Sequence, residues 1–144
     1  MRALIALDWS EQAFAAVREV SYLYDLHEVI LVHGIDLGMF QYPIVAEVSN
    51  MQGYDDFRKA MGKAGEQLLD HTSTLLPSEG LSITRVCEFG KPASLILDKA
   101  RETHADLIVI GARGRGRVGE LVLGSVSHRV ALHADCTTLI VKER

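Results

Sequence analysis

The chain has 144 residues, of which 48% are hydrophobic and 24% are charged, and its formal net charge is −4. This size and composition predict a single globular domain over residues 1–144 with a sizeable core. The negative net charge argues against nucleic acid as a partner, because nucleic-acid-binding domains are usually basic. No apolar run approaches the roughly 20 residues of a membrane helix, and no secretory leader is visible, so we expect no membrane insertion and a cytoplasmic location.

Apolar residues recur along the chain with the alternating periods of strands and helices. Ser10 suits a helix N-cap, and Pro92 suits a first helical position. The segment that starts at Asp36 and ends at Gln52 is irregular but rich in apolar residues, so we expect it to pack on the core or on a protein partner. In chain order the pattern predicts a strand at 3–7, a helix from Ser10 to about Tyr24, a strand at 29–32, the irregular segment, a helix at 53–76, a strand at 81–88, a helix from Pro92 to about Thr103, a strand at 106–110, a helix from Gly124 or Ser125, and a strand at Thr137–Val141.

This alternation predicts an α/β fold: an open parallel five-stranded sheet with right-handed crossovers and helices on both faces. The strand at 81–88 has mixed faces, which suits a sheet edge. In such sheets ligands bind at the carboxyl ends of the strands, where the strand order reverses. We expect that point between the first and fourth strands, with Asp8 and Gly111 on opposite sides of one crevice.

A glycine-rich loop follows the fourth strand. Gly111-Ala112-Arg113-Gly114 is separated by nine residues from Gly124-Ser125, and Arg113, Arg115 and Arg117 add positive charge. A strand, a loop of this kind and a helix N-terminus form a ready phosphate site, because backbone N–H groups and the helix dipole both favour anions. A flexible connection is the alternative, but it needs fewer glycines. The literal GxGxxG match at 114–119 is weak as a dinucleotide fingerprint, which belongs on the first strand–helix turn.

Asp8 comes at the end of the first predicted strand, and Gly34 lies just past the second. Asp8 could accept hydrogen bonds from a ribose or help to cap the first helix. Gly34 could present its backbone to an adenine edge or simply terminate its strand. His128 and His133 are poorly spaced for a shared metal, and we expect neither a metal site nor a catalytic residue.

The last predicted strand, Thr137–Val141, is apolar at consecutive positions although it would lie at a sheet edge. Only the charged residues that follow it protect that edge. Because unprotected edges tend to pair with another chain, we expect a homodimer joined partly through this strand.

The spacing of Gly111, Gly114 and Gly124-Ser125 resembles the nucleotide motif of the universal stress protein family. Similar stretches cover about residues 2–142, namely Asp8-Trp9-Ser10 after the first strand, His33-Gly34-Ile35-Asp36 in the second, Gly90-Lys91-Pro92, and Gly124-Ser125-Val126-Ser127. The resemblance implies strand order 3-2-1-4-5 in a Rossmann-like, adenine nucleotide alpha hydrolase-like fold, a dimer through the last strand, and binding of ATP. It also implies that Cys87 and Cys136 lie at opposite edges, too far apart for an intrachain disulfide.

Carried over residue by residue, the resemblance places Asp8 at the ribose and the Gly34 backbone at adenine. Gly34 stands where the family often has a larger apolar residue, which would thin one wall of the adenine pocket. The implied nucleotide-binding residues are Ala6, Asp8, Gly34, Gly111, Arg113, Gly114, Arg115, Gly124, Ser125, Val126 and Ser127, with Mg²⁺ or Mn²⁺ beside the phosphates.

The function that these observations predict is that of an ATP-binding regulatory protein, a dimeric sensor or modulator in a stress response. AMP, ADP or a cyclic nucleotide would fit the same cradle. Slow Mg²⁺-dependent ATP hydrolysis is an alternative, since a cradle with a cation stabilises developing charge, although no residue is placed to orient water. An interaction module with a vestigial nucleotide site is the other alternative.

Overall fold

The computed structural model describes residues 1–40, 51–77, 79–112 and 123–142. Within them, the chain forms five strands and five helical segments. In order these are β1 Arg2–Ala6, α1 Glu11–Leu23, β2 Glu28–Ile35, the 3-10 helix η1 Leu37–Phe40, α3 Met51–Ser73, β3 Ser82–Phe89, α4 Pro92–Glu102, β4 Leu107–Gly111, α5 Ser125–His133 and β5 Thr137–Val141.

The strands form one parallel sheet in the order β3-β2-β1-β4-β5, which confirms the predicted topology. β1 lies at the centre and is buried throughout after Arg2, as its apolar sequence predicts. β3 and β5 are the two edges, so Cys87 and Cys136 belong to opposite sides of the sheet, and both are free thiols.

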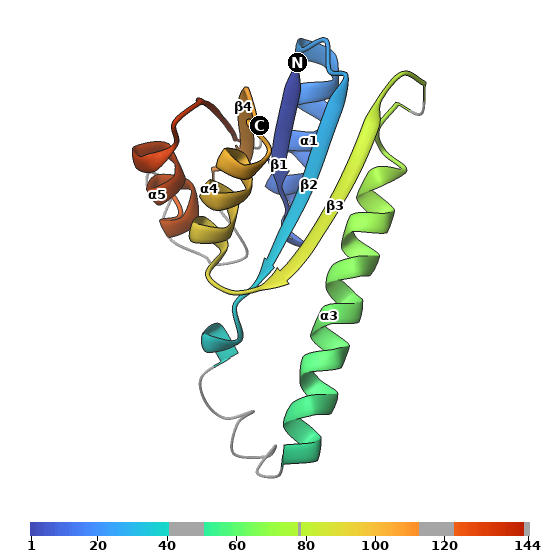
Figure 1. Ribbon diagram of the computed structural model, residues 1–144, viewed down its shortest axis with the longest axis vertical. Helices are drawn as coiled ribbons and strands as arrows, with labels where there is room; N and C mark the ends of the chain where they lie inside the picture. The colour runs from blue at the N-terminus through green and yellow to red at the C-terminus, as the bar shows by residue number, and fades with distance from the viewer. Residues whose placement is uncertain (41–50, 78, 113–122, 143–144) are drawn as a thin grey trace.

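Helices cover both faces of the sheet (Figure 1). α1 and α3 pack on the face formed by Ala3, Ile5, Val29 and Leu31, and α4 and α5 pack on the face formed by alternate residues such as Leu4, Ile30 and Ile108. The two cores therefore follow the period of two that a strand imposes on its side chains. The first residues of α3 lie in space beyond the carboxyl end of β3, and the helix runs antiparallel to that strand (Figure 1).

The helix starts agree with the residues that predicted them. The Ser10 hydroxyl accepts a hydrogen bond from Ala13 N at 3.2 Å, so Ser10 is the N-cap of α1. Pro92 is the first residue of α4, where its missing N–H leaves no bond unmade.

Most boundaries differ from the sequence-based expectation by one to three residues, and two of the differences bear on the site. β2 continues to Ile35 because it pairs with β3 as far as the Ile35–Phe89 register, so Gly34 lies inside the strand and does not terminate it. The predicted irregular segment begins with the 3-10 helix η1, where Asp36 Oδ1 accepts a hydrogen bond from Gly38 N at 2.9 Å. Residues 41–50 of that segment lie outside the described residues.

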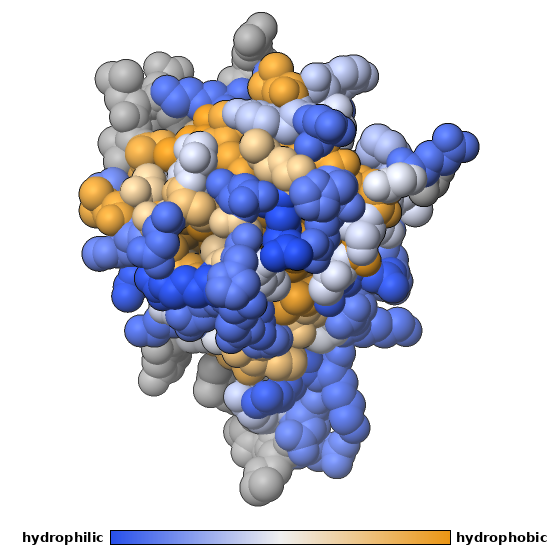
Figure 2. Space-filling model, turned by 45° about the horizontal axis from the view of Figure 1, so that its top comes forward, coloured by the Kyte–Doolittle hydropathy of each residue, from blue (hydrophilic) through white to orange (hydrophobic). Residues whose placement is uncertain are grey.

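On the face seen in Figure 2, hydrophobic residues reach the surface in patches between hydrophilic ones. Among the described residues, no helix is both long and apolar enough to cross a membrane.

Candidate functional site

The strand order reverses at β1: successive strands are added on one side of it up to β3 and on the other side from β4 onward. We call the carboxyl end of β1, between β2 and β4, the switch point. The β1–β2 pairing ends with Leu7 N, which donates to Val32 O at 2.8 Å. β2 then runs on along β3, and Gly90 N donates to Ile35 O at 3.0 Å. The strand at the centre of the sheet therefore stops before its neighbour does.

This stagger turns the backbone of Gly34 toward the switch point. Successive residues of a parallel strand direct their N–H and C=O groups to opposite neighbours. Val32 points to β1 and Ile35 points to the β3 side, so Gly34 points to the side on which β1 has ended. No hydrogen bond from the described part of the chain occupies its N–H or C=O. A donor and an acceptor thus stand side by side where a ligand could pair with both.

The missing side chain of Gly34 serves the packing of α4. A Cβ at this position would lie 3.0 Å from Pro92 Cα and 3.4 Å from Leu95 Cδ2. The space that a larger residue would fill is therefore taken by the first turn of α4. Whether the missing side chain also thins a wall of the adenine pocket stays a prediction.

Asp8 lies two residues past the end of β1 and is half-buried. Its Oδ1 accepts hydrogen bonds from the Ser10 backbone N at 2.9 Å and from the Ser10 hydroxyl. One carboxylate oxygen thus shapes the turn into α1, which is close to the capping role that the sequence left open. Within the described residues Oδ2 has no partner, and contact with a ribose stays a prediction for that oxygen.

Gly111 ends β4 on the other side of the switch point and is buried. A Cβ there would lie 3.0 Å from Gln12 Cβ and 3.1 Å from the Gln12 carbonyl carbon. Glycine at this position therefore lets β4 pack tightly against the first turn of α1. Because Ala112 N donates to Val141 O at 2.7 Å, the backbone of Gly111 is turned to the β1 side.

The two ends of the glycine-rich loop are tied together. Ala112 O accepts hydrogen bonds from Gly124 N at 2.9 Å and from the Ser127 hydroxyl at 2.8 Å, and that hydroxyl also lies 2.9 Å from Gly124 O. Ser127 is only 2% exposed. Its hydroxyl closes the neck of the loop, a role that the sequence did not reveal, and a direct contact of Ser127 with phosphate stays a prediction.

Helix α5 starts at that neck. Gly124 is its N-cap with φ −61° and has no side-chain cap, so the first N–H groups of the helix are not covered by a capping side chain. Ser125 is exposed, and Val126 packs partly on the core. Ala6 is buried beside Val32 at the end of β1. Arg113, Gly114, Arg115 and Arg117 lie outside the described residues.

His33 was missed by the sequence analysis. Its Nδ1 lies 2.8 Å from Leu7 O, directly beside the residue pair that ends the β1–β2 ladder. A histidine directly after the apolar run Val29–Val32 was the available signal.

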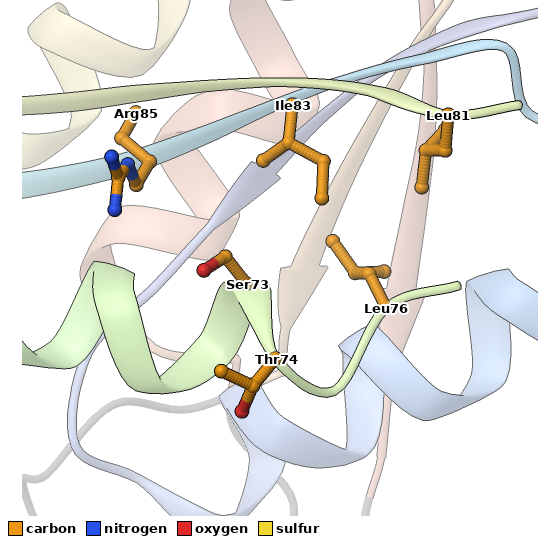
Figure 3. Close-up of a pocket in the computed structure, with 6 residues that line it drawn as sticks. All are labelled: Ser73, Thr74, Leu76, Leu81, Ile83 and Arg85. Atoms are coloured by element: carbon orange, nitrogen blue, oxygen red, sulfur yellow. The ribbon is translucent and has the colours of Figure 1, made fainter. Parts of the chain in front are cut away.

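A separate cavity of about 490 Å³ lies at the opposite end of the sheet, between the end of α3 and the start of β3 (Figure 3). Leu81 and Ile83 point from the strand side toward Ser73 and Leu76. The polar groups there are already paired: the Ser73 hydroxyl donates to Asp70 O at 2.7 Å, the Thr74 hydroxyl donates to His71 O, and Arg85 pairs with Asp70. Within the described residues, each of these three polar side chains already has a protein partner. In the described part of the chain, no group of three or more His, Cys, Asp or Glu side chains could hold a metal ion.

A parallel sheet in this order, with glycines on both sides of its switch point, defines the doubly wound α/β class, whose ligands bind at that point. A sequence model of the universal stress protein family matches residues 1–142, and the chain belongs to this family.

Comparison with individual proteins agrees with this assignment. The chain is 35% identical over 88 residues to the universal stress protein YxiE of Bacillus subtilis, an alignment that spans 61% of this chain and 60% of the relative's length. Among solved structures, the protein MJ0577 superposes with a TM-score of 0.85 at 24% identity, covering 99% of this chain and 96% of that one.

Two further neighbours were solved with nucleotides. A universal stress protein family protein from Arabidopsis thaliana, with AMP bound, has a TM-score of 0.68 at 18% identity and covers 100% of this chain and 92% of its own. A universal stress protein in complex with cAMP has a TM-score of 0.61 at 20% identity and covers 99% and 96%. At these identities the likeness establishes the shared fold.

Proposed function

We propose that this protein binds an adenine nucleotide at the switch point and acts as a nucleotide-dependent regulatory protein in a stress response. The observation that carries the proposal is the stagger of β1 and β2, which leaves the N–H and C=O of Gly34 side by side and facing the switch point. Adenine carries an amino donor beside a ring-nitrogen acceptor, so one backbone residue can pair with both and select adenine by its edge.

The rest of the nucleotide would extend from the carboxyl end of β1 to the N-terminus of α5. Asp8 Oδ2 is the proposed ribose partner. The phosphates would meet the N-terminus of α5 at Gly124 and Ser125, where uncapped N–H groups and the helix dipole favour anions. Gly111, Gly114, Arg113 and Arg115 are the further proposed phosphate residues from the loop.

We propose ATP as the principal ligand, with Mg²⁺ or Mn²⁺ entering on its phosphates. The neighbours solved with AMP and with cAMP support an adenine nucleotide as the ligand class. A cation would neutralise phosphate charge, and the Asp8 carboxylate is the proposed acidic group nearest to the ligand. The residues of the switch point supply binding and orientation, and we assign none of them to bond cleavage.

The first test is nucleotide occupancy. The purified protein is denatured, the released small molecules are identified by mass spectrometry, and stripped protein is titrated with ATP, AMP and cAMP, with and without Mg²⁺, by calorimetry. Co-purified adenine nucleotide or saturable binding near micromolar supports the proposal. Absence of both would overturn it, whichever nucleotide is used.

A matched pair of variants at Gly124 localises the site. The backbone there (φ −61°, ψ 154°) accepts any residue, and Asp and Asn are equally good N-caps, so both variants should fold. Gly124→Asp places a carboxylate against phosphate and is expected to abolish ATP binding, whereas Gly124→Asn, of the same shape, competes with phosphate for the first N–H groups of α5 without adding charge repulsion and is expected to weaken binding much less. Equal ATP affinities in the two folded variants would show that the phosphates do not bind at the N-terminus of α5.

We further propose that the protein is a homodimer through β5 and works in the cytoplasm. β5 pairs with β4 on one side, and Leu139 and Ile140 in its middle are only half-buried, as an edge that awaits a partner would be. Leu139→Glu is expected to give monomers in analytical ultracentrifugation. The segment from Asp36 to Gln52 remains our proposed contact for a protein partner.

A further inference from the structure

We propose that His33 is a positioning residue of the nucleotide site: its imidazole replaces one hydrogen bond of the β1–β2 ladder and thereby keeps the N–H of Gly34 available to adenine. The consequence for adenine rests on the proposed function. The structural part of the inference can be tested without any ligand.

The register of the two strands defines the bond that is replaced. In a parallel ladder a residue that donates its N–H to one carbonyl accepts, at its own C=O, from the residue two positions further along the neighbouring strand. Leu7 N donates to Val32 O at 2.8 Å, so the next ladder bond would run from Gly34 N to Leu7 O. That bond is absent within the described residues, and His33 Nδ1 lies 2.8 Å from Leu7 O in its place.

The chemistry of the two groups fixes the direction of this bond. A carbonyl oxygen only accepts, so Nδ1 must carry the proton and donate it. Leu7 is 5% exposed, which makes an unpaired carbonyl there costly. The imidazole supplies the hydrogen bond that the Leu7 carbonyl would otherwise take from a backbone N–H. The chain can therefore leave the sheet at Asp8 without a hydrogen bond from Gly34 N to Leu7 O.

The ring is held from its other side by α3. A Cβ on Gly65 would lie 2.9 Å from His33 Cδ2, and it would lie 2.5 Å from Cys87 Sγ. The helix therefore contacts the imidazole closely enough to restrict it, and only glycine leaves the ring its place. His33 is joined to the sheet at Nδ1 and bounded by the helix at Cδ2.

Three substitutions separate the hydrogen bond from the bulk of the side chain. In His33→Asn the amide nitrogen can occupy the place of Nδ1, whereas in His33→Gln the donor lies one bond further out. His33→Leu has similar bulk and no donor. Each variant is measured by calorimetric titration with ATP and AMP, and by NMR hydrogen exchange of the Gly34 amide in the nucleotide-free protein.

We expect His33→Leu to lose about tenfold in affinity for ATP and AMP, because the Gly34 N–H moves to Leu7 O and must be withdrawn for binding. The same variant should slow exchange of the Gly34 amide. His33→Asn should stay near the wild-type affinity and exchange rate, and His33→Gln should behave like His33→Leu. A merely structural role would make folded Asn and Gln variants equally weak, with no change at the Gly34 amide.

The inference is overturned if His33→Leu binds as tightly as the wild type, or if the Asn variant is as weak as the Gln variant. If the wild-type protein binds no nucleotide, the proposed function fails, and the Gly34 amide still decides the role of His33. Equal exchange in wild type and His33→Leu would then reject it. Should His33→Leu not fold, the Asn and Gln pair provides the same comparison.

Discussion

The two ends of the sheet differ in whether their polar groups have hydrogen-bond partners. At the amino end Arg2 pairs with Glu28 at 2.5 Å and also donates to Thr103 O, and its backbone N donates to Asp106 Oδ2 at 2.8 Å. At the carboxyl end β1 stops early, and the backbone of Gly34 is left without a partner in the described residues. The difference teaches that the unpaired backbone on which the proposed nucleotide site rests arises from the unequal lengths of neighbouring strands, since the polar groups named at the amino end are paired.

The largest effect is expected where β4 packs against the backbone of a helix. In Gly111→Val the new Cβ would stand 3.0 Å from Gln12 Cβ and 3.3 Å from Ala13 N, and its methyl groups would press on the first turn of α1. Overpacking of this kind costs about 1–3 kcal/mol, and we expect the upper part of that range because backbone must move. Urea unfolding measures the loss.

Gly111→Ala should lie between the wild type and the valine variant in the same experiment. A valine variant with an unchanged free energy of unfolding would mean that β4 and α1 are not in close contact. The switch point would then lack one of the two walls assigned to it.

The next effect distinguishes two glycines on one helix. Gly65→Ala would drive its Cβ to within 2.5 Å of Cys87 Sγ and 2.9 Å of His33 Cδ2, whereas Gly62→Ala meets only Phe89, at 3.7 Å. Removing glycine from a helix gains up to about 1 kcal/mol, so Gly62→Ala should stabilise the protein slightly. Gly65→Ala should destabilise it by about 1–2 kcal/mol and should also weaken nucleotide binding through His33.

Thermal and urea unfolding of both variants, followed by ATP titration, makes the comparison. Stabilisation by Gly65→Ala would contradict the close approach of α3 to β2 and β3. If Gly65→Ala lowers the free energy of unfolding but leaves the affinity for ATP unchanged, His33 does not contribute to the nucleotide site.

Much of this architecture is predictable from the chain. The apolar runs and their period gave all five strands, and Ser10 and Pro92 marked two helix starts. Their success has a physical reason: a buried parallel strand needs consecutive apolar residues, and helix starts need specific caps. The strand order came from resemblance and not from periodicity, because pairing partners leave no local pattern.

The site was harder to predict, for reasons visible in particular residues. Gly34 and Gly111 were singled out as ligand contacts, yet each also lacks a side chain because a helix packs against it. His33 and Ser127 were not recognised as backbone partners, because hydrogen bonds from side chains to distant carbonyls depend on where strands end. Gly65 looked only like a weak helix former, since its neighbours His33 and Cys87 are more than 20 residues away in sequence.

A smaller effect is expected at the amino end. Arg2→Met removes the pairing with Glu28 and Thr103 O but keeps much of the apolar stem. Since the Arg2 and Glu28 side chains are 34% and 26% exposed, solvent screens the pair, and we expect a loss of about 1 kcal/mol. Arg85→Met, in a more exposed pair with Asp70, should lose less than about 0.5 kcal/mol.

Neither arginine variant should change ATP affinity, because both positions lie away from the switch point. Calorimetric titration checks this beside urea unfolding. A weaker ATP affinity in Arg2→Met would mean that the two ends of the sheet are coupled, and the contrast drawn between them would not hold.

The smallest effects concern the two thiols, one near each end of the sheet. Burial raises the pKa of both Cys87 and Cys136, and the nearby Glu66 carboxylate raises the pKa of Cys87 further. A raised pKa in the folded state means that folding favours the protonated thiol. The contribution to stability is complete below the pKa of the unfolded thiol, about 8.5, and is lost as pH rises through the folded value.

The free energy of unfolding should therefore fall above about pH 8.5 in the wild type, and fall less in Cys87→Ser. Alkylation by iodoacetamide at pH 8 should be slower at both thiols than in unfolded chain. Cys87 Sγ lies against Gly65 together with the ring of His33, so a nucleotide that fastens the end of β2 should suppress the local opening that exposes this thiol. ATP is then expected to slow the alkylation of Cys87 by about twofold or more and to leave Cys136 nearly unchanged. Equal protection of both thiols would show that ATP stabilises the whole fold without distinguishing its two ends, and protection of Cys136 alone would place the nucleotide away from the switch point.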